Sequence, residues 1–283
     1  MTSPPLDLAL LQQWKDKTET QDDVIRGEMA DALAAVLDRP APPAGTPLPP
    51  LWHWIYFWVI RPQAELGPDG HPRRGGFLPP VPLPRRMWAG GRLQFAAPLP
   101  VGAAATRRSR ILDVSAKQGR SGNLAFVTVR HEISHDGTLA LSEEHDIVYR
   151  DPPQAGATSP PPKMAPESAA WSRTVTPDPV LLFRYSALTF NGHRIHYDRS
   201  YVTEVEGYPG LIVHGPLIAT LLLDLLQRRL PDASVESFSF RAIGPLFDIE
   251  PFEVCGEPDG NTVRLWAKNL RGELAMQAEA VLA

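Results

Sequence analysis

The sequence predicts an α+β protein in which an antiparallel sheet curves around a central helix. Two observations support this. Each half of the chain contains apolar residues at helical spacing, and in each half these are followed by several short segments with the alternation of strands. A helix followed by a run of strands is typical of α+β folds, whereas strict alternation of the two is typical of parallel sheets. At 283 residues the chain has room for one large domain or two small ones.

Proline marks a boundary between the two halves. The chain contains 31 prolines, and six of them fall in the segment DPPQAGATSPPPKMAP, which has few apolar side chains. Proline fixes φ and has no N–H to donate, so we expect an extended linker at residues 151–166. This places one domain at residues 1–150 and a second at residues 167–283.

The first domain is predicted to open with helices at 6–15 and 21–37. Thr20 is a plausible N-cap for the second helix, with Asp22 and Asp23 in its first turn. The 15 prolines between residues 40 and 100 are interspersed with aromatic residues, which indicates irregular but packed structure. Asp-Gly at 136–137 is a strong signal for a hairpin turn. Strands are predicted at 92–95, 103–115, 125–134 and 139–149.

The second domain is predicted to begin with a short apolar strand at 181–185, followed by a helix at 214–229. The first half of this helix is apolar on almost every side, which suits a helix that is buried all round. Pro216 is well placed as its first residue, and Arg228 and Arg229 suit its last turn. Four further strands are predicted at 234–243, 252–257, 263–268 and 273–282.

Composition excludes several classes of function. A net charge of −4 provides no basic field for nucleic acid or anionic lipid. The single cysteine, Cys255, excludes an intramolecular disulfide. The N-terminal residues lack the basic segment of a targeting peptide, and the apolar runs are far shorter than the ~20 residues that span a bilayer. We therefore expect a cytoplasmic protein that binds neither nucleic acid nor membrane.

The densest cluster of reactive side chains is FRYSALTFNGHRIHYD at 183–198, followed by GLIVHGP at 210–216. Three of the eight histidines, His193, His196 and His214, fall within 22 residues. Their spacings match no zinc arrangement, and no cysteine is nearby, so we predict neither a metal nor a cofactor.

This cluster resembles the signature of the MaoC-like (R)-specific enoyl-CoA hydratases. The residues that carry the resemblance are Asn191-Gly-His-Arg-Ile-His196, the preceding Tyr185-Ser186 and the following Val213-His214-Gly215. The sequence is most similar to the subgroup that contains mesaconyl-C4-CoA hydratases, itaconyl-CoA hydratases and hydroxyacyl-thioester dehydratases. GGFLPPVPLPRRMWAGG at 75–91 resembles the N-terminal hot-dog domain of that subgroup.

The resemblance implies a double hot-dog fold, with two central helices each wrapped by an antiparallel sheet. It also implies reversible hydration of an enoyl-CoA, with a short branched or dicarboxylic acyl group such as mesaconyl or itaconyl. The wider family has Asp-x-Asn-Pro-x-His, and in this chain Asn191 replaces the aspartate and His193 the asparagine. An amide cannot be a general base, so the base would be His196 alone.

The remaining roles follow from the chemistry that such a site needs. Asn191 would hold the attacking water, and the N–H of Gly215, at a helix start, would bind the thioester oxygen. Contacts with the substrate are expected from six neighbours, namely Tyr185, Ser186, His193, Arg194, Val213 and His214.

Other interpretations of these residues stay open. His196 could instead be a hydrogen-bonded histidine of the core. His214 could cap a helix and Asp198 a turn. Trp54 could belong to the core or to the wall that binds the acyl group. Two alternative functions are dehydration of acyl groups on an acyl-carrier protein and non-catalytic binding of acyl-CoA. The first domain has no Asn/Asp-x4-His motif, so we expect it to be non-catalytic. Two fused hot-dog domains form the basic pair of this fold, so we expect a homodimer of such chains.

Overall fold

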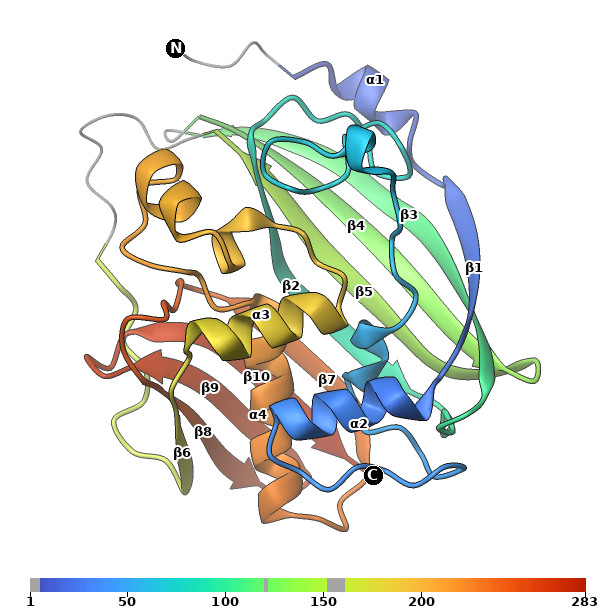
Figure 1. Cartoon of the computed structure of the whole chain (residues 1–283), viewed down its shortest axis with the longest axis vertical. Coiled ribbons are helices and arrows are strands. Elements are labelled where there is room, and N and C mark those ends of the chain that lie inside the picture. The colour runs from blue at the N-terminus through green and yellow to red at the C-terminus, as the bar shows by residue number, and fades with distance from the viewer. Residues whose placement is uncertain (1–5, 120–121, 152–160) are drawn as a thin grey trace.

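The computed structural model describes residues 6–119, 122–151 and 161–283. Ten strands form one antiparallel sheet in the order β1-β3-β4-β5-β2-β7-β10-β9-β8-β6 (Figure 1). The strands of the first half are β1 (Thr18–Val24), β2 (Arg85–Phe95), β3 (Ala104–Gly119), β4 (Gly122–His135) and β5 (Thr138–Arg150). Those of the second half are β6 (Trp171–Val175), β7 (Val235–Ala242), β8 (Phe252–Asp259), β9 (Thr262–Asn269) and β10 (Leu274–Leu282).

The strand order repeats between the halves, because β1-β3-β4-β5-β2 has the same connectivity as β6-β8-β9-β10-β7. The halves join where β2 pairs antiparallel with β7, with Gly90 opposite Arg241. A Cβ atom on Gly90 would lie 2.6 Å from the carbonyl oxygen of Phe240, so only glycine allows this approach. The double hot-dog fold is confirmed, and the two sheets pair edge to edge into one continuous sheet.

The helices of the two halves differ. In the second half, α4 (Gly215–Arg229) lies against β6, β8, β9 and β10, and ten consecutive residues of it are buried, from Leu217 to Leu226. In the first half, α2 (Gly27–Val36) packs against α3 (Pro179–Leu188) (Figure 1). None of the described helices combines the length and apolar character that crossing a membrane requires.

Between α2 and β2 the described chain forms only two short 3-10 turns, η1 (Trp52–Ile55) and η2 (Gln63–Glu65). Six prolines between residues 40 and 50 prevent a helix there, because each removes an N–H donor and clashes with the preceding turn. Under the sheet of the first half there is therefore no counterpart of α4 in the part of the chain that the structure describes.

Most predicted elements are confirmed within a few residues. Asp136 and Gly137 both have positive φ, at 48° and 74°, as a tight hairpin turn between β4 and β5 requires. Pro216 lies in the first turn of α4, as predicted. The predicted strand at 92–95 is the end of the longer β2, and the predicted helix at 6–15 is the shorter α1 (Leu8–Gln12).

Two predictions of secondary structure are wrong. The first part of the predicted helix at 21–37 is strand β1, which alternates in burial and pairs with β3. The predicted strand at 181–185 belongs to α3, which begins at Pro179 after Asp178 caps it by accepting a hydrogen bond from the N–H of Leu181. A five-residue apolar run fits either element, and here the cap decides.

The predicted linker at 151–166 stays a prediction. Residues 152–160 of this segment lie outside the described residues. The boundary it implies lies between β5, which ends at Arg150, and β6, which begins at Trp171.

Candidate active site

A cavity of about 2240 Å³ lies between the two halves and is lined by residues of both. Its volume exceeds the ~300–1,000 Å³ of most small-molecule pockets. It extends under the strands of the first half, where no long helix fills the space. Eight of the nine residues predicted for the site line it: Tyr185, Ser186, Asn191, His193, Arg194, His196, Val213 and Gly215.

His196 ends the short turn η3 (Arg194–His196) and is only 7% exposed. Its Nδ1 lies 2.7 Å from the carbonyl oxygen of Ile212. A carbonyl only accepts, so Nδ1 carries the proton and Nε2 is left with a free lone pair. Burial lowers the pKa of His196 to about 4, although the hydrogen bond to Ile212 opposes that shift. The ring is therefore a neutral base at physiological pH.

His214 backs the ring of His196. The two rings stack with centroids 3.7 Å apart, and Nε2 of His214 shares a 2.8 Å hydrogen bond with the hydroxyl of Ser186. The ring of Tyr185 packs edge-on against His214 at 5.0 Å. His214 occupies the N-cap position of α4, but its side chain makes no capping hydrogen bond. Tyr185, Ser186 and His214 thus form a support behind His196.

Gly215 is the first residue of α4, directly after His214. The N–H groups of a helix's first turn have no intrahelical acceptor, and they carry the positive end of the helix dipole. A Cβ atom at Gly215 would meet nothing within 4 Å, so the space beside this backbone is open. The position suits a donor to an oxygen that becomes negatively charged in a reaction.

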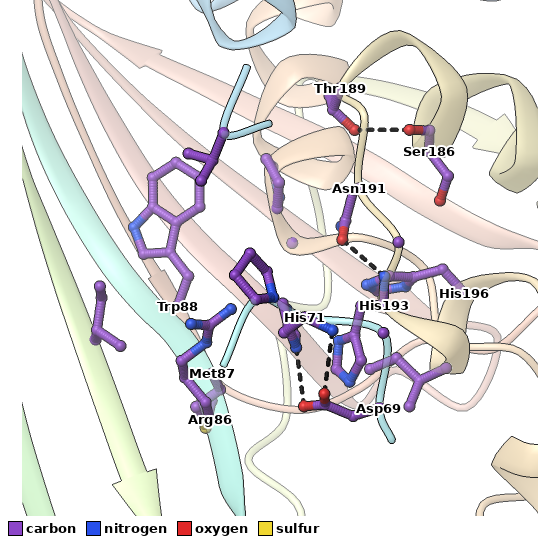
Figure 2. Close-up of a pocket in the computed structure, with 18 of the residues that line it drawn as sticks. Asp69, His71, Arg86, Met87, Trp88, Ser186, Thr189, Asn191, His193 and His196 are labelled. Carbon is purple, nitrogen blue, oxygen red and sulfur yellow. Dashed lines mark hydrogen bonds and ion pairs between the residues drawn. The ribbon is translucent and has the colours of Figure 1, made fainter. Parts of the chain in front are cut away.

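Asn191 follows α3, and its side chain turns back onto its own loop. Its Oδ1 accepts a 3.0 Å hydrogen bond from the N–H of His193, and its own N–H donates to the carbonyl of Ser186 at 2.8 Å (Figure 2). Among the described residues its Nδ2 group has no hydrogen-bond partner, so the amide can donate to a molecule in the cavity.

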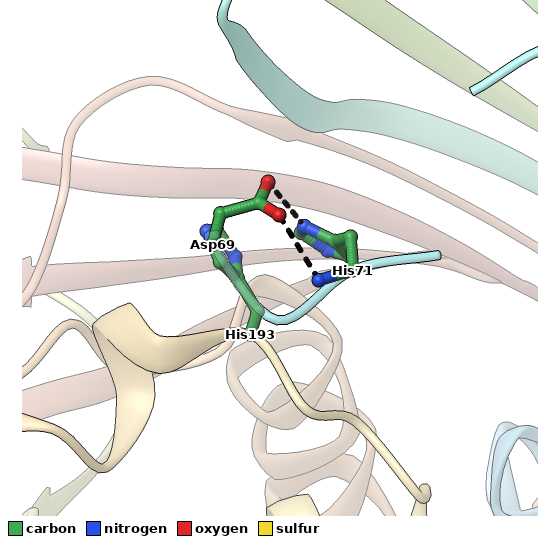
Figure 3. A group of neighbouring side chains, drawn as sticks. All are labelled: Asp69, His71 and His193. Carbon is green, nitrogen blue, oxygen red and sulfur yellow. Dashed lines mark hydrogen bonds and ion pairs between the residues drawn. The ribbon is translucent and has the colours of Figure 1, made fainter. Parts of the chain in front are cut away.

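The first half contributes a further histidine, His71, to the site. Nδ1 of His71 lies 3.0 Å from Oδ2 of Asp69, and its ring lies 4.0 Å from that of His193 (Figure 3). Burial lowers the pKa values of His71 and His193, and each ring lies near other positive groups. A Cβ atom on Gly70 would lie 1.8 Å from the carbonyl oxygen of Gly192, which shows how closely the two loops approach.

Arg194 joins those loops. Its backbone N–H donates to the carbonyl of Asp69 at 2.9 Å, and its guanidinium donates to Asp198 at 2.7 and 2.9 Å and to the carbonyl of Pro68 at 3.1 Å. Asp198 also accepts from the N–H of Tyr201, as a turn cap does. Arg194 is thus engaged by protein groups. The sequence does not predict Asp69 and His71 as site residues, because D-x-H in a loop has no distinguishing signal.

A second buried cluster lies in the first half and also lines the cavity. Oε2 of Glu143 is 2.8 Å from Nε1 of Trp54, 3.0 Å from Nε2 of His145 and 3.3 Å from Nε2 of His53. Burial alone would raise the pKa of Glu143, but His145 and His53 bring it well below its usual range. This cluster connects η1 to β5. Trp54 therefore has both of the roles expected of it, as part of the core and as part of the cavity wall.

Two groups of side chains have the composition of a metal site, each with two histidines and one carboxylate. They are Asp69, His71 and His193, and His131, Glu143 and His145, with ligand atoms within 4.8 Å of one another. In each group the carboxylate already contacts a histidine of the same group at 3.0 Å. A carboxylate–histidine contact is therefore enough to explain why these side chains lie together in each group. The absence of a metal stays a prediction.

The fold is a double hot-dog, and comparison with known proteins identifies the chain as an acyl-thioester hydro-lyase. The family model of hydroxyacyl-thioester dehydratase type 2 matches residues 51–248, and the chain belongs to this family. It is 49% identical over 271 residues to a mesaconyl-C(4)-CoA hydratase of Chloroflexus aurantiacus, covering 95% of this chain and 96% of the relative.

Two further comparisons extend the likeness. A mitochondrial hydroxyacyl-thioester dehydratase type 2 of Schizosaccharomyces pombe is 27% identical over 254 residues, covering 81% of this chain and 83% of the relative. The crystal structure of HtdX from Mycobacterium tuberculosis superposes with a TM-score of 0.67 at 18% identity, covering 93% of this chain and 98% of the other. At that identity the structural likeness supports the fold alone.

Proposed function

We propose that the protein catalyses the reversible hydration of an enoyl-CoA whose acyl group is short and branched or dicarboxylic, of the mesaconyl or itaconyl type. We propose further that it acts as a cytoplasmic homodimer, with its catalytic groups on the second half and the first half contributing to the cavity wall. The 49% identical relative, matched along nearly its whole length, supports this substrate class.

In the proposed reaction Nε2 of His196 takes a proton from water. The water oxygen bonds to the β-carbon, and the electrons of the double bond move toward the thioester oxygen. The N–H of Gly215 donates to this oxygen as it becomes negative, a contribution of about 3 kcal/mol for one such donor. The α-carbon then receives the proton from His196. The reverse sequence eliminates water.

One observation carries this proposal. The carbonyl of Ile212 binds Nδ1 of His196 and so fixes the tautomer that has a free Nε2. His196 lines the cavity, and among the described residues its Nε2 has no hydrogen-bond partner, so this nitrogen can accept a proton from a molecule there. Asn191, with its free amide group, supports the arrangement because a donor to the water oxygen would orient its lone pair toward the β-carbon.

A second candidate function is dehydration of longer acyl groups on an acyl-carrier protein. The specific observation in its favour is the cavity volume of about 2240 Å³, with Trp54, Trp58 and Trp88 on its wall. A five-carbon acyl group would fill only part of that space.

The test is hydration measured by the loss of absorbance of the enoyl-thioester band. Mesaconyl-C4-CoA, itaconyl-CoA, crotonyl-CoA and crotonyl groups on acyl-carrier protein form the panel. We expect the highest kcat/KM with a dicarboxylic CoA thioester and none above background with His196→Ala. Preference for the carrier-protein substrate would support the second candidate, and binding without turnover of any member would support a non-catalytic acyl-CoA-binding protein.

A further inference from the structure

We infer that Arg86 binds the free carboxylate of a dicarboxylic acyl group and thereby determines the substrate specificity of the site. This inference rests on the proposed function, since it assumes that the β-carbon is hydrated beside His196. It assigns a role to a residue of the first half, which carries none of the proposed acid–base groups.

The chemistry of the substrate class restricts where such a residue must lie. In mesaconyl-C4-CoA and itaconyl-CoA the carboxylate is bonded to the β-carbon, the same atom that receives the hydroxyl. A cation that recognises it must therefore reach into the part of the cavity that the water-activating histidine lines. An uncompensated carboxylate is strongly disfavoured in a buried site, whereas arginine can bind one through two parallel hydrogen bonds.

Arg86 has this position. It lies on β2 and lines the cavity, with Trp88 two residues further along the same face of the strand. Figure 2 shows its guanidinium reaching from β2 toward His71, on the side of the pocket opposite His196. Its positive charge contributes to the lowered pKa values of His71 and His193, which places it within electrostatic range of both rings.

The other half-buried arginines of the cavity wall are already bound by the protein. Arg85 pairs with Glu206 at 3.4 Å, and Arg194 with Asp198 at 2.7 Å. Arg74 donates to three backbone carbonyls. Arg107 donates to Gln21 at 2.8 Å.

The guanidinium of Arg86, in contrast, donates to neither a carboxylate nor a backbone carbonyl among the described residues. Its charge lies near the buried hydroxyl of Tyr149 on β5 and near the rings of His71 and His193. Neither His193 nor His196 supplies a charge, since burial lowers the pKa of both. Arg86 is thus a permanent cation with unused donors, on the wall that faces the reacting carbon.

The test compares two pairs of thioesters that differ at the β-carbon substituent. Mesaconyl-C4-CoA and crotonyl-CoA report turnover. Succinyl-CoA and butyryl-CoA, which have no double bond to hydrate, report binding as competitive inhibitors. For Arg86→Gln we expect kcat/KM for mesaconyl-C4-CoA and affinity for succinyl-CoA to fall by about 100-fold, as for the loss of one partner of a buried charge pair. Values for crotonyl-CoA and butyryl-CoA should change less than about 3-fold.

Two variants serve as controls. Arg85→Gln removes the same charge from the neighbouring residue of β2. Because Arg85 is paired with Glu206, this variant should change neither the ratio of kcat/KM for mesaconyl-C4-CoA to that for crotonyl-CoA nor the ratio of affinities for succinyl-CoA and butyryl-CoA. Arg86→Lys keeps the charge but cannot form two parallel hydrogen bonds. Its kcat/KM for mesaconyl-C4-CoA and its affinity for succinyl-CoA should therefore lie between those of the wild type and Arg86→Gln.

Other outcomes overturn the inference or the function separately. Equal losses for both members of a pair would assign Arg86 a structural role. A wild-type enzyme that hydrates crotonyl-CoA but not mesaconyl-C4-CoA would overturn the carboxylate site and leave hydration intact. A wild-type protein inactive on every thioester would contradict the proposed function, and dissociation constants of succinyl-CoA and butyryl-CoA, measured by calorimetry for the wild type and Arg86→Gln, would then decide the role of Arg86.

Discussion

The imidazole rings of His196 and His214 stack with centroids 3.7 Å apart and an angle of 18° between their planes. Both rings are buried, and burial lowers both pKa values, with the neighbouring His196 as a further cause for His214. Protonating one ring places a charge against the face of the other, at a buried position where a charge is poorly solvated. The pair therefore stays neutral in the free protein, and only His196 has a nitrogen free toward the cavity.

Replacing His196 with alanine should lower kcat/KM by about 10²–10⁴-fold, since it removes the only base proposed for the reaction. His135→Ala is a matched control, because this histidine lies at the end of β4 and does not line the cavity. Steady-state hydration rates and melting temperatures of both variants check the assignment. Near-wild-type turnover in a folded His196→Ala protein would remove His196 from the mechanism.

The pH dependence of kcat/KM should show its acidic limb near pH 4 rather than near 6.5, because burial lowers the pKa of His196 to about 4. Asn191→Asp should move that limb to higher pH. A carboxylate keeps the acceptor for the N–H of His193, and it favours the charged form of a nearby imidazole. Asn191→Ala adds no charge, so it should lower turnover without moving the limb. Rates measured from pH 4 to 9 separate these outcomes, and a limb at 6.5 in the wild type would contradict the account.

The buried histidines also predict how folding stability depends on pH. Those with lowered pKa values, such as His131 and His214, take up protons more readily in the unfolded chain, whose histidines titrate near 6.5. Between 6.5 and the lower folded values the unfolded state binds more protons, so the free energy of unfolding falls as pH falls through this range.

Denaturant unfolding at pH 8, 7, 6 and 5 measures that dependence. His214→Gln should reduce the loss of stability between pH 7 and 5, and His135→Gln is the matched control. Constant stability from pH 8 to 5 would show that these histidines are charged or accessible in the folded protein.

A buried carboxylate in α4 binds arginines from both halves. Asp224, whose side chain is 1% exposed, pairs with Arg39 at 3.0 Å, Arg173 at 3.1 Å and Arg228 at 2.8 Å. Asp224→Asn should lower the free energy of unfolding by about 3–5 kcal/mol, because it leaves cationic partners unpaired near the core. Asp232→Asn, at an exposed position after the helix, should change it by less than about 0.5 kcal/mol. Equal effects would contradict a role for the buried network.

The sequence alone predicted residues that lie close together in the chain and that line one cavity in the structure, while their catalytic roles stay a proposal. Asn191, His196 and Gly215 fall within 25 residues, and the turn after α3 and the start of α4 bring them to one cavity. His71 and Arg86 come from the other half, more than 100 residues away, and only tertiary packing places them there. Spacing along a chain carries no information about such contacts.

The same limit explains the errors in secondary structure. Thr20, Asp22 and Asp23 satisfy the rules for a helix start, but pairing with β3 makes this segment a strand. Among the described residues the first half has no counterpart of α4, and six prolines between residues 40 and 50 are unfavourable for a long helix in that segment. Recognising its absence required the chain's path between α2 and β2, which no periodicity predicts.

The β2–β7 seam also bears on how copies of this chain can associate. β2 and β7 pair with each other, so neither strand has a free edge at the seam and a second molecule cannot add a strand there. A homodimer would therefore have to form through another surface, such as β1 or β6 at the outer ends of the sheet. A fragment of residues 161–283 made alone would expose the edge of β7, and its nearest complementary surface would be β7 of another fragment. Cutting the chain at its boundary would thus replace one covalent pair of hot-dog halves with a non-covalent one.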